Sequence, residues 1–132
     1  MNESSDPMPS AQKTIIIVED EQDAAEMFAE MMRVNGFRVL KSSGSANAMN
    51  LITRENPAAI ILDIMMPDIS GLEVLRFMRR EPKLATIPVI VVSAKSMPSD
   101  IQTGLDAGAS AYLTKPVGYL DLKEAVEKVL GA

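Results

Sequence analysis

The sequence contains no cysteine and no histidine among its 132 residues. Without cysteine the chain can form neither disulfides nor thiolate metal sites, and its composition is compatible with a reducing compartment. Without histidine it lacks the usual general base and the usual transition-metal ligand, and it cannot itself carry a phosphohistidine. These absences exclude two common kinds of catalytic and metal site, and we expect the protein to be cytoplasmic.

Positive charge and long apolar segments are also scarce. The chain has 13 Lys and Arg against 18 Asp and Glu, a formal net charge of -5, which argues against non-specific binding to nucleic acid. No apolar stretch approaches the roughly 18 residues of a membrane span, so we expect no membrane insertion. Residues 1–12 (MNESSDPMPSAQ) are polar and lack the apolar core of a signal peptide. We predict a disordered tail there, followed by one domain over residues 13–132.

Strand-like and helix-like segments alternate along the rest of the chain. The strand-like segments are short and mostly β-branched or apolar, which is typical of buried strands: 14–20, 37–42, 58–63, 87–94 and 110–114. The segments between and after them have apolar residues at helical spacing: 21–36, 45–56, 71–80, 99–108 and 118–130. This alternation predicts an α/β fold with a five-stranded parallel sheet covered on both faces.

Local patterns predict how several of these helices pack and begin. The apolar face of segment 21–36 is predicted to consist of Ala24, Met27, Phe28 and Met31. Ser45 is a candidate N-cap of the second helix. Ser99 and Gln102 have the spacing of a capping box at the start of the fourth helix.

Polar side chains stand at the carboxyl ends of four predicted strands. Glu19 and Asp20 end the first segment, Asp63 ends the third, Ser93 closes the fourth and Lys115 follows the fifth. In doubly wound sheets the carboxyl ends of the strands border the ligand-binding crevice. Each residue alone has a structural explanation: a helix-capping pair, a loop carboxylate, a strand-end hydroxyl and a solvated lysine. Their joint placement favours a functional site.

The charges of this group predict a metal and a phosphoryl group. Three carboxylates in one crevice repel each other, and Mg²⁺ binds through a few carboxylates, waters and phosphate oxygens. Glu19, Asp20 and Asp63 contribute -3, Mg²⁺ +2 and Lys115 +1, so the sum is zero. A nucleotide or flavin cradle would require glycines after the first strand, and VEDEQD contains none.

Four motifs together resemble the receiver domain of bacterial two-component response regulators: IVEDE, LDIMMPDISGLEVL, VIVVSA and DAGASAYLTKP. The resemblance extends from Thr14 to Leu130. It implies a flavodoxin-like (βα)5 fold with strand order 2-1-3-4-5. It also implies that Asp63 is the phospho-acceptor, which attacks a phosphohistidine on a histidine kinase or a histidine phosphotransfer protein.

The resemblance assigns roles to the remaining site residues. Glu19 and Asp20 hold Mg²⁺, which Mn²⁺ can replace, together with Asp63 and the backbone carbonyl of Met65.

Ser93 and Lys115 contact phosphoryl oxygens, and Tyr112 occupies the aromatic switch position. The Lys115–Pro116 peptide bond is predicted to be cis. Gly104, inside the fourth helix, either destabilises a segment that must rearrange or allows close packing.

Two residues depart from the common family pattern. Glu19 stands where the family commonly has aspartate, which lengthens one arm of the metal site. Met65 stands where many relatives have a polar residue. A thioether is a very weak hydrogen-bond acceptor, so it would hold an attacking water poorly, and we predict slow loss of the phosphoryl group from Asp63.

The sequence therefore predicts a phospho-accepting signalling switch that is not an enzyme beyond its own phosphorylation and dephosphorylation. The chain ends two residues after Leu130, so we expect it to lack an output domain and to act through a partner protein or relay the phosphoryl group. Two alternatives remain open: a receiver module cut from a longer multidomain signalling protein, and an interaction module that is never phosphorylated. The kinase, the downstream target and the pathway are not specified by the sequence.

Overall fold

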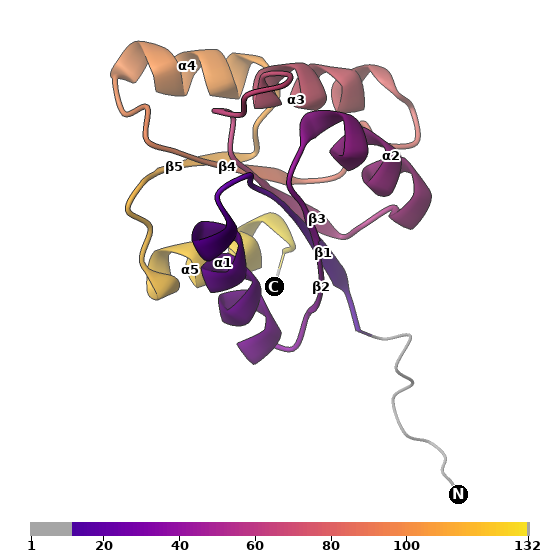
Figure 1. The fold of residues 1–132 in the computed structure, drawn as a ribbon, viewed down its shortest axis with the longest axis vertical. Helices are drawn as coiled ribbons and strands as arrows, with labels where there is room; N and C mark the ends of the chain where they lie inside the picture. Colours follow the sequence, from indigo (N-terminus) through magenta and orange to yellow (C-terminus); the bar gives the residue numbers. More distant parts are fainter. Residues whose placement is uncertain (1–11, 132) are drawn as a thin grey trace, which may run out of the picture.

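The computed structural model describes residues 12–131 and shows strands and helices in strict alternation (Figure 1). The ten elements are β1 (Thr14–Val18), α1 (Gln22–Val34), β2 (Arg38–Ser42), α2 (Ser45–Glu55), β3 (Ala59–Leu62), α3 (Gly71–Arg80), β4 (Val89–Ser93), α4 (Pro98–Asp106), β5 (Ala111–Thr114) and α5 (Tyr119–Val129). All five strands and all five helices predicted from the sequence are present.

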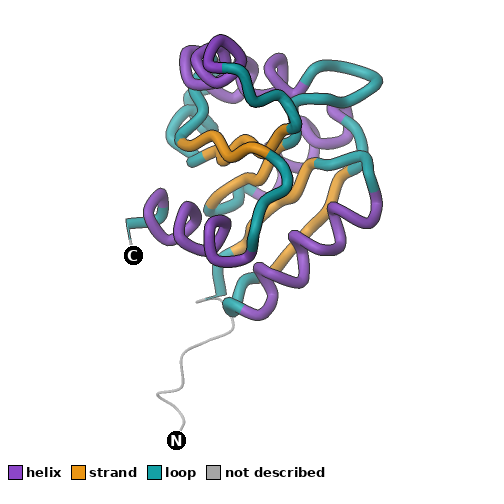
Figure 2. The backbone as a smooth tube through the Cα atoms, turned by 90° about the vertical axis from the view of Figure 1, so that its left-hand side faces the viewer, coloured by secondary structure: helices purple, strands orange, loops and turns teal. Residues whose placement is uncertain are grey.

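The strands form one parallel sheet in the order β2-β1-β3-β4-β5, and Figure 2 shows them side by side between the helices. In the register of the central strands, Ile16 of β1 is paired with Leu40 of β2 and with Ile60 of β3. The predicted fold class and strand order are therefore confirmed. The order reverses between β1 and β3, which places the crevice at the carboxyl ends of these strands.

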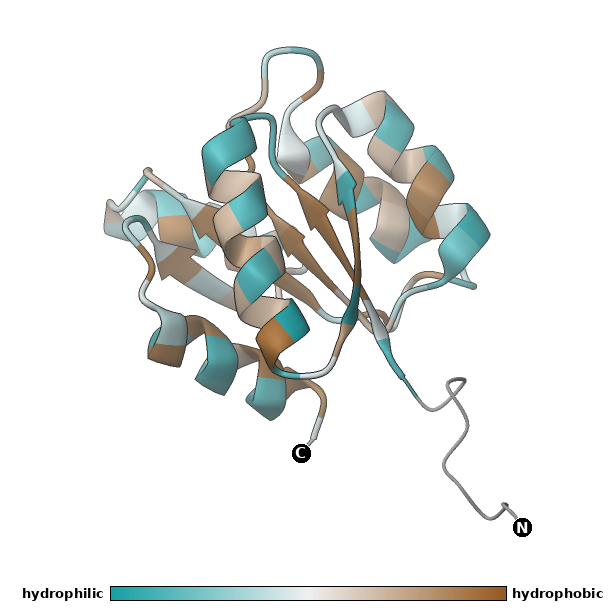
Figure 3. Cartoon of the chain, turned by 60° about the horizontal axis from the view of Figure 1, so that its bottom comes forward, coloured by the Kyte–Doolittle hydropathy of each residue, from teal (hydrophilic) through white to brown (hydrophobic). Residues whose placement is uncertain are grey.

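Helices cover both faces of the sheet, with α1 and α5 on one face and α2, α3 and α4 on the other (Figure 1). Alternate residues of β1 supply the two cores: Ile15 and Ile17 pack with α1 and α5, whereas Ile16 and Val18 pack with α2 and α3. Figure 3 shows hydrophobic strands at the centre and helices in which hydrophilic and hydrophobic residues alternate. Burial on both faces explains why these strands are continuously apolar.

The predicted apolar face of α1 is rotated relative to the face that is buried. The buried residues are Ala25, Phe28, Ala29 and Met32, whereas Met27 is 44% exposed. Both stripes contain Phe28 and both have helical spacing. The buried stripe has two alanines, which let the helix axis approach the sheet closely, so packing rather than periodicity selected the face.

Two predicted caps are also wrong by a few residues. Ser45 is the first residue of α2, after the N-cap Gly44, and its hydroxyl donates to the carbonyl of Ile69 instead of capping its own helix. At α4, the Asp100 carboxylate accepts a hydrogen bond from the backbone N–H of Met97 at 3.2 Å. The N-cap of α4 is thus Met97, and the predicted capping pair of Ser99 and Gln102 is two residues too late. Pro98 occupies the first helical position, where its fixed φ and missing N–H are tolerated.

Most of the predicted disordered tail, residues 1–12, lies outside the described part of the chain. Gln12 is described, and its side-chain amide donates to the carbonyl of Gly36 at 3.2 Å. Within residues 12–131, none of the helices combines the length and the apolar character that crossing a membrane requires.

Candidate functional site

The predicted acidic residues meet at the carboxyl end of the sheet. Glu19 and Asp20 follow β1 directly and Asp63 follows β3 directly, and these two strands are neighbours. One carboxylate oxygen from each of the three residues lies within 4.8 Å of the others. Asp20 is the most accessible of the three, whereas Glu19 and Asp63 are buried. The prediction that these three side chains converge is confirmed.

Lys115 connects the two buried carboxylates. It follows β5, and its Nζ lies 2.8 Å from Oε1 of Glu19 and 3.0 Å from Oδ2 of Asp63. Glu19 is 2% and Asp63 is 5% exposed. A buried carboxylate without a counter-charge is costly, so one lysine partly neutralises two acids that are 44 residues apart in the sequence. With Asp20 included, the acids still exceed the lysine by two negative charges (-3 + 1 = -2).

Burial and charge shift the pKa of two of these groups. Burial raises the pKa of Glu19, the hydrogen bond from Lys115 opposes that shift, and the nearby charge of Asp63 adds to it. Burial by itself would lower the pKa of Lys115, but its hydrogen bonds to Glu19 and Asp63 and the negative charges of these two carboxylates together raise that pKa. Lys115 therefore stays positively charged and serves as the counter-charge of both carboxylates.

Backbone N–H groups hold the carboxylates in place. Met65 N donates to Oδ1 of Asp63 at 2.9 Å, and Glu21 N donates to Oε2 of Glu19 at 3.2 Å. Each oxygen of the Asp63 carboxylate thus has a hydrogen-bond donor, one from the backbone and one from Lys115. The side chain of Met65 is 49% exposed at the surface beside this loop.

The start of α3 closes tightly on the loop that follows Asp63. A Cβ at Gly71 would lie 2.6 Å from Cα of Ile64 and 2.7 Å from the carbonyl oxygen of Asp63. Only glycine allows this approach without moving the backbone next to the carboxylate. This explains the glycine that follows the IMMPDIS segment in the sequence.

A tie between the loop after Asp63 and α2 was not predicted from the sequence. The Asp68 carboxylate accepts a hydrogen bond from Ser45 N at 2.9 Å, and the Ser45 hydroxyl donates to the carbonyl of Ile69. Backbone N–H groups, that of Ile69 first, lower the pKa of Asp68. The tie joins residues more than 20 positions apart, so no local pattern indicates it.

Ser93 is brought to the crevice but makes a local contact. It is fully buried at the end of β4, and its Oγ accepts a hydrogen bond from Lys95 N at 3.1 Å. Among the hydrogen bonds of residues 12–131, none joins Ser93 to Asp63. In this structure the Ser93 hydroxyl is hydrogen-bonded at the end of its strand, and the same bond anchors the β4–α4 loop. Its contact with a phosphoryl oxygen stays a prediction.

Tyr112 lies against α4 and is tied to the same loop. Its hydroxyl donates to the carbonyl of Lys95 at 2.8 Å. A Cβ at Gly104 would lie 2.8 Å from both Cδ2 and Cε2 of the ring, so the close-packing explanation of Gly104 is correct. Burial raises the pKa of Tyr112.

The peptide bond before Pro116 is cis, as predicted. It is the bond between Pro116 and the lysine that contacts the two buried carboxylates.

The donor set of the crevice fits a hard divalent cation. Three carboxylates lie close together with an excess of negative charge after Lys115 is counted. Oxygen ligands of this kind suit Mg²⁺ or Mn²⁺. Because the chain has no histidine or cysteine, imidazole and thiolate ligands for softer metals are excluded.

Comparisons with known proteins agree with the fold and the site. A model of the response regulator receiver domain family matches residues 15–127. The polar-differentiation response regulator DivK of Brucella ovis is 30% identical over 119 residues, which cover 90% of this chain and 97% of that protein. A putative response regulator from Chloroflexus aurantiacus J-10-fl is 30% identical with a TM-score of 0.88, over 92% of this chain and 99% of that chain.

A further solved structure carries a metal. The receiver domain of the sensor histidine kinase PA1611 from Pseudomonas aeruginosa PAO1 is 26% identical with a TM-score of 0.85, over 92% of this chain and 99% of that chain. It is described with a magnesium ion coordinated in its active site cleft.

A doubly wound five-stranded sheet with an acidic crevice at the carboxyl ends of its strands is the architecture that this chain shares with solved response regulator receiver domains. The chain belongs to the response regulator receiver domain family. It is thus a signalling protein of the two-component type.

Proposed function

We propose that Asp63 accepts a phosphoryl group from a phosphohistidine of a histidine kinase or a histidine phosphotransfer protein. A carboxylate oxygen of Asp63 forms the new bond to phosphorus while the bond from phosphorus to the histidine nitrogen breaks. The electron pair of that bond stays on the nitrogen, and the histidine leaves as a neutral imidazole with the proton that its other ring nitrogen carried. The observation that carries the proposal is the position of the Asp63 carboxylate, at the carboxyl end of β3 with Lys115 at 3.0 Å. Phosphoryl transfer depends mainly on positioning and electrostatic stabilisation of this kind.

We propose Mg²⁺ as the resident metal, with Mn²⁺ as a substitute. Glu19, Asp20 and Asp63 would hold it with the backbone carbonyl of Met65, and the magnesium of the PA1611 receiver domain supports this assignment. When bound, the metal supplies positive charge to the oxygens of the transferring group. Lys115 contributes a second positive charge from the β5 side of the crevice.

Phosphorylation is proposed to rearrange the α4–β5 side of the domain. The Ser93 hydroxyl would exchange its bond to Lys95 N for one to a phosphoryl oxygen and move the β4–α4 loop. The Tyr112 hydroxyl bonds the carbonyl of Lys95 in the same loop, so its ring would leave Gly104 when the loop moves. The face formed by α4, β5 and α5 would then change its shape, by a shift between two populations.

The test is the intact mass of the chain after incubation with Mg²⁺ and acetyl phosphate. We expect the addition of one phosphoryl group to the parent and none to Asp63→Asn. Asp23→Asn, at an exposed aspartate in the first turn of α1, is the matched control and should be labelled like the parent. Full labelling of Asp63→Asn would contradict the assignment. Absence of labelling in the parent would favour an interaction module that is not phosphorylated.

A further inference from the structure

The edge of the sheet at β5 lacks the charges that protect the edge at β2. Exposed edge strands commonly carry charged residues that discourage pairing with another chain. β2 has Arg38 and Lys41, which form ion pairs with Glu55 and Glu26. β5 (AYLT) has no charged residue, and within the described part of the sheet it pairs only with β4. Its outer backbone groups are therefore available to another extended segment.

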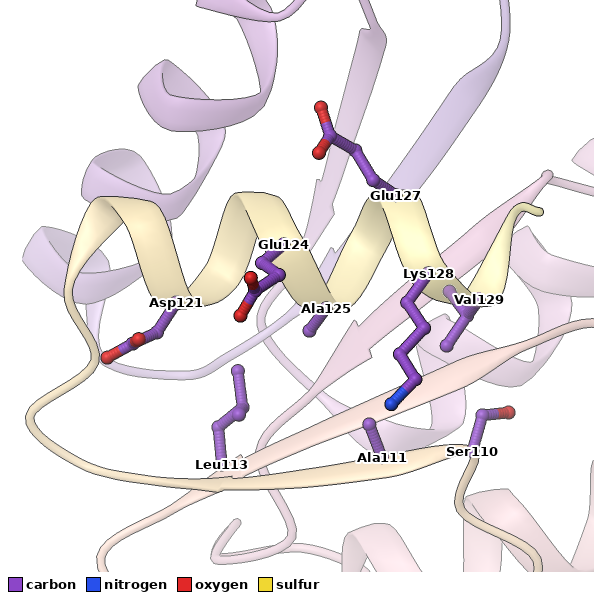
Figure 4. A pocket seen from close by; sticks show the side chains of 9 residues that line it. All are labelled: Ser110, Ala111, Leu113, Asp121, Glu124, Ala125, Glu127, Lys128 and Val129. Carbon is purple, nitrogen blue, oxygen red and sulfur yellow. The ribbon is translucent and has the colours of Figure 1, made fainter. Parts of the chain in front are cut away.

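A hollow of about 910 Å³ lies beside this edge, between β5 and α5 (Figure 4). Apolar side chains from both elements line part of it: Ala111, Leu113, Ala125 and Val129. These four residues are only partly buried against the core under α1 and α5. The hollow can therefore accept side chains of a segment that pairs with β5.

The charges on α5 are distributed unevenly along the hollow. In Figure 4 the side chains of Asp121 and Glu124 lie toward the Leu113 end of β5. Glu127 points away from β5 and pairs with Lys123 at 3.1 Å. Among the salt bridges of residues 12–131, none involves Asp121 or Glu124. Two carboxylates without an ionic partner thus border one end of the hollow.

We propose that β5 and α5 bind an extended segment of a partner protein that carries a lysine or arginine on its α5 side. The segment would add a strand to β5 through backbone hydrogen bonds, and its side chains on the α5 side would enter the hollow. A lysine or arginine there would meet Asp121 and Glu124. The inference rests on the proposed function in one respect, because β5 and α5 belong to the face that phosphorylation would rearrange.

The position of Lys128 predicts a second charged residue in the partner segment. Lys128 lies at the Ala111 end of the hollow (Figure 4) and four residues after Glu124, which is about 6 Å along a helix. Two residues of a strand span about 6.6 Å and place their side chains on the same face. A basic residue with an acidic residue two positions away therefore matches Glu124 and Lys128 together.

A second copy of the chain is a less suitable occupant. With Glu127 turned away from β5 and paired with Lys123, the charged side chains left at the hollow are two acids, Asp121 and Glu124, and one lysine, Lys128. The whole chain carries a net charge of -5. Two such edges would bring charges of the same sign together, which disfavours association.

The test is a titration of the isotopically labelled, unphosphorylated chain with two blocked peptides. One is Ser-Thr-Val-Lys-Val-Glu-Thr, and the other has glutamate in place of its lysine. We expect the lysine peptide alone to shift the backbone amide signals of residues 111–114. Asp121→Asn combined with Glu124→Gln should weaken its binding roughly tenfold, about threefold for each exposed ion pair. Glu127→Gln, on the same helix but pointing away, is the matched control and should bind like the parent.

Three results would overturn the proposal: equal binding of both peptides, signals that shift away from β5, and a double variant that binds like the parent. Sedimentation that shows a dimer, with β5 signals that change on dilution, would assign the edge to a second copy instead. The mass test for phosphorylation of Asp63 is run separately on the same protein. Failure of peptide binding with intact labelling refutes only the edge proposal, and failure of labelling refutes only the proposed function.

Discussion

Replacing Gly104 with alanine tests whether the Tyr112 ring packs against α4 only because position 104 has no side chain. The new Cβ would lie 2.8 Å from two ring carbons, whereas carbon atoms in good contact are about 3.5–4.0 Å apart. Exchanging glycine for alanine inside a helix stabilises it by about 1 kcal/mol, but overpacking costs about 1–3 kcal/mol. If the ring moves, the hydrogen bond from Tyr112 to Lys95 is also lost, at about 0.5–1.5 kcal/mol. We expect Gly104→Ala to lower the free energy of unfolding by ~1–2 kcal/mol.

A double-mutant cycle separates the clash between the new Cβ and the Tyr112 ring from the higher helix propensity of alanine at position 104. In a Tyr112→Ala background the ring is absent, so Gly104→Ala should raise the free energy of unfolding by about 1 kcal/mol. The coupling between the two positions should therefore be about 2–3 kcal/mol. Tyr112→Phe keeps the ring and removes the hydroxyl, and it shows how much of the coupling comes from the bond to Lys95. Urea unfolding followed by far-UV circular dichroism gives all of these values. If Gly104→Ala stabilises the parent as much as it stabilises Tyr112→Ala, the ring does not need the glycine.

Three further predictions concern the crevice and its loop. Met65→Asn should lose the phosphoryl group of Asp63 faster than the parent at fixed pH and Mg²⁺, because an amide side chain can hold the attacking water. Each tenfold increase in this rate corresponds to ~1.4 kcal/mol in the barrier. Equal or slower decay would show that the methionine does not limit access of water. Lys115→Met should lower the free energy of unfolding without metal by about 3 kcal/mol, because two buried carboxylates lose their counter-charge, and urea titrations should show that Mg²⁺ stabilises this variant more than the parent; an equal gain would count against the pairing. Ser45→Ala should cost ~1 kcal/mol in the same assay through its bond to Ile69, and an unchanged midpoint would show that the loop does not depend on it.

The sequence alone was sufficient for the elements of the fold and for the composition of the crevice. Buried parallel strands are apolar on both faces, so segments such as 14–20 and 58–63 stand out without any knowledge of their partners. In a parallel sheet the carboxyl ends share one edge, so Glu19, Asp63 and Lys115 could be placed together before any distance was known. Both inferences depend on local patterns and on the symmetry of a parallel sheet.

The tertiary structure decided which of several equivalent local patterns is used. The apolar face of α1 could have centred on Met27, and contact with the sheet selected the stripe with Ala25 instead. The capping patterns at Ser45 and Ser99 were also consistent with the sequence, but the hydroxyl of Ser45 bonds a loop from another part of the chain. Local periodicity cannot rank such patterns, because the ranking depends on the packing energy of distant segments.

The contacts that connect the crevice to its surroundings were visible in the tertiary structure alone. Asp68 reaches Ser45, and the ring of Tyr112 fills the space left by Gly104. These pairs are separated by 23 and 8 positions and lie in different segments of the chain, so they meet only when the fold has formed. The sequence therefore determined what the site is made of, and the fold determined how the site is held and which neighbours it contacts, because such contacts arise from packing between elements and not from the order of residues within one.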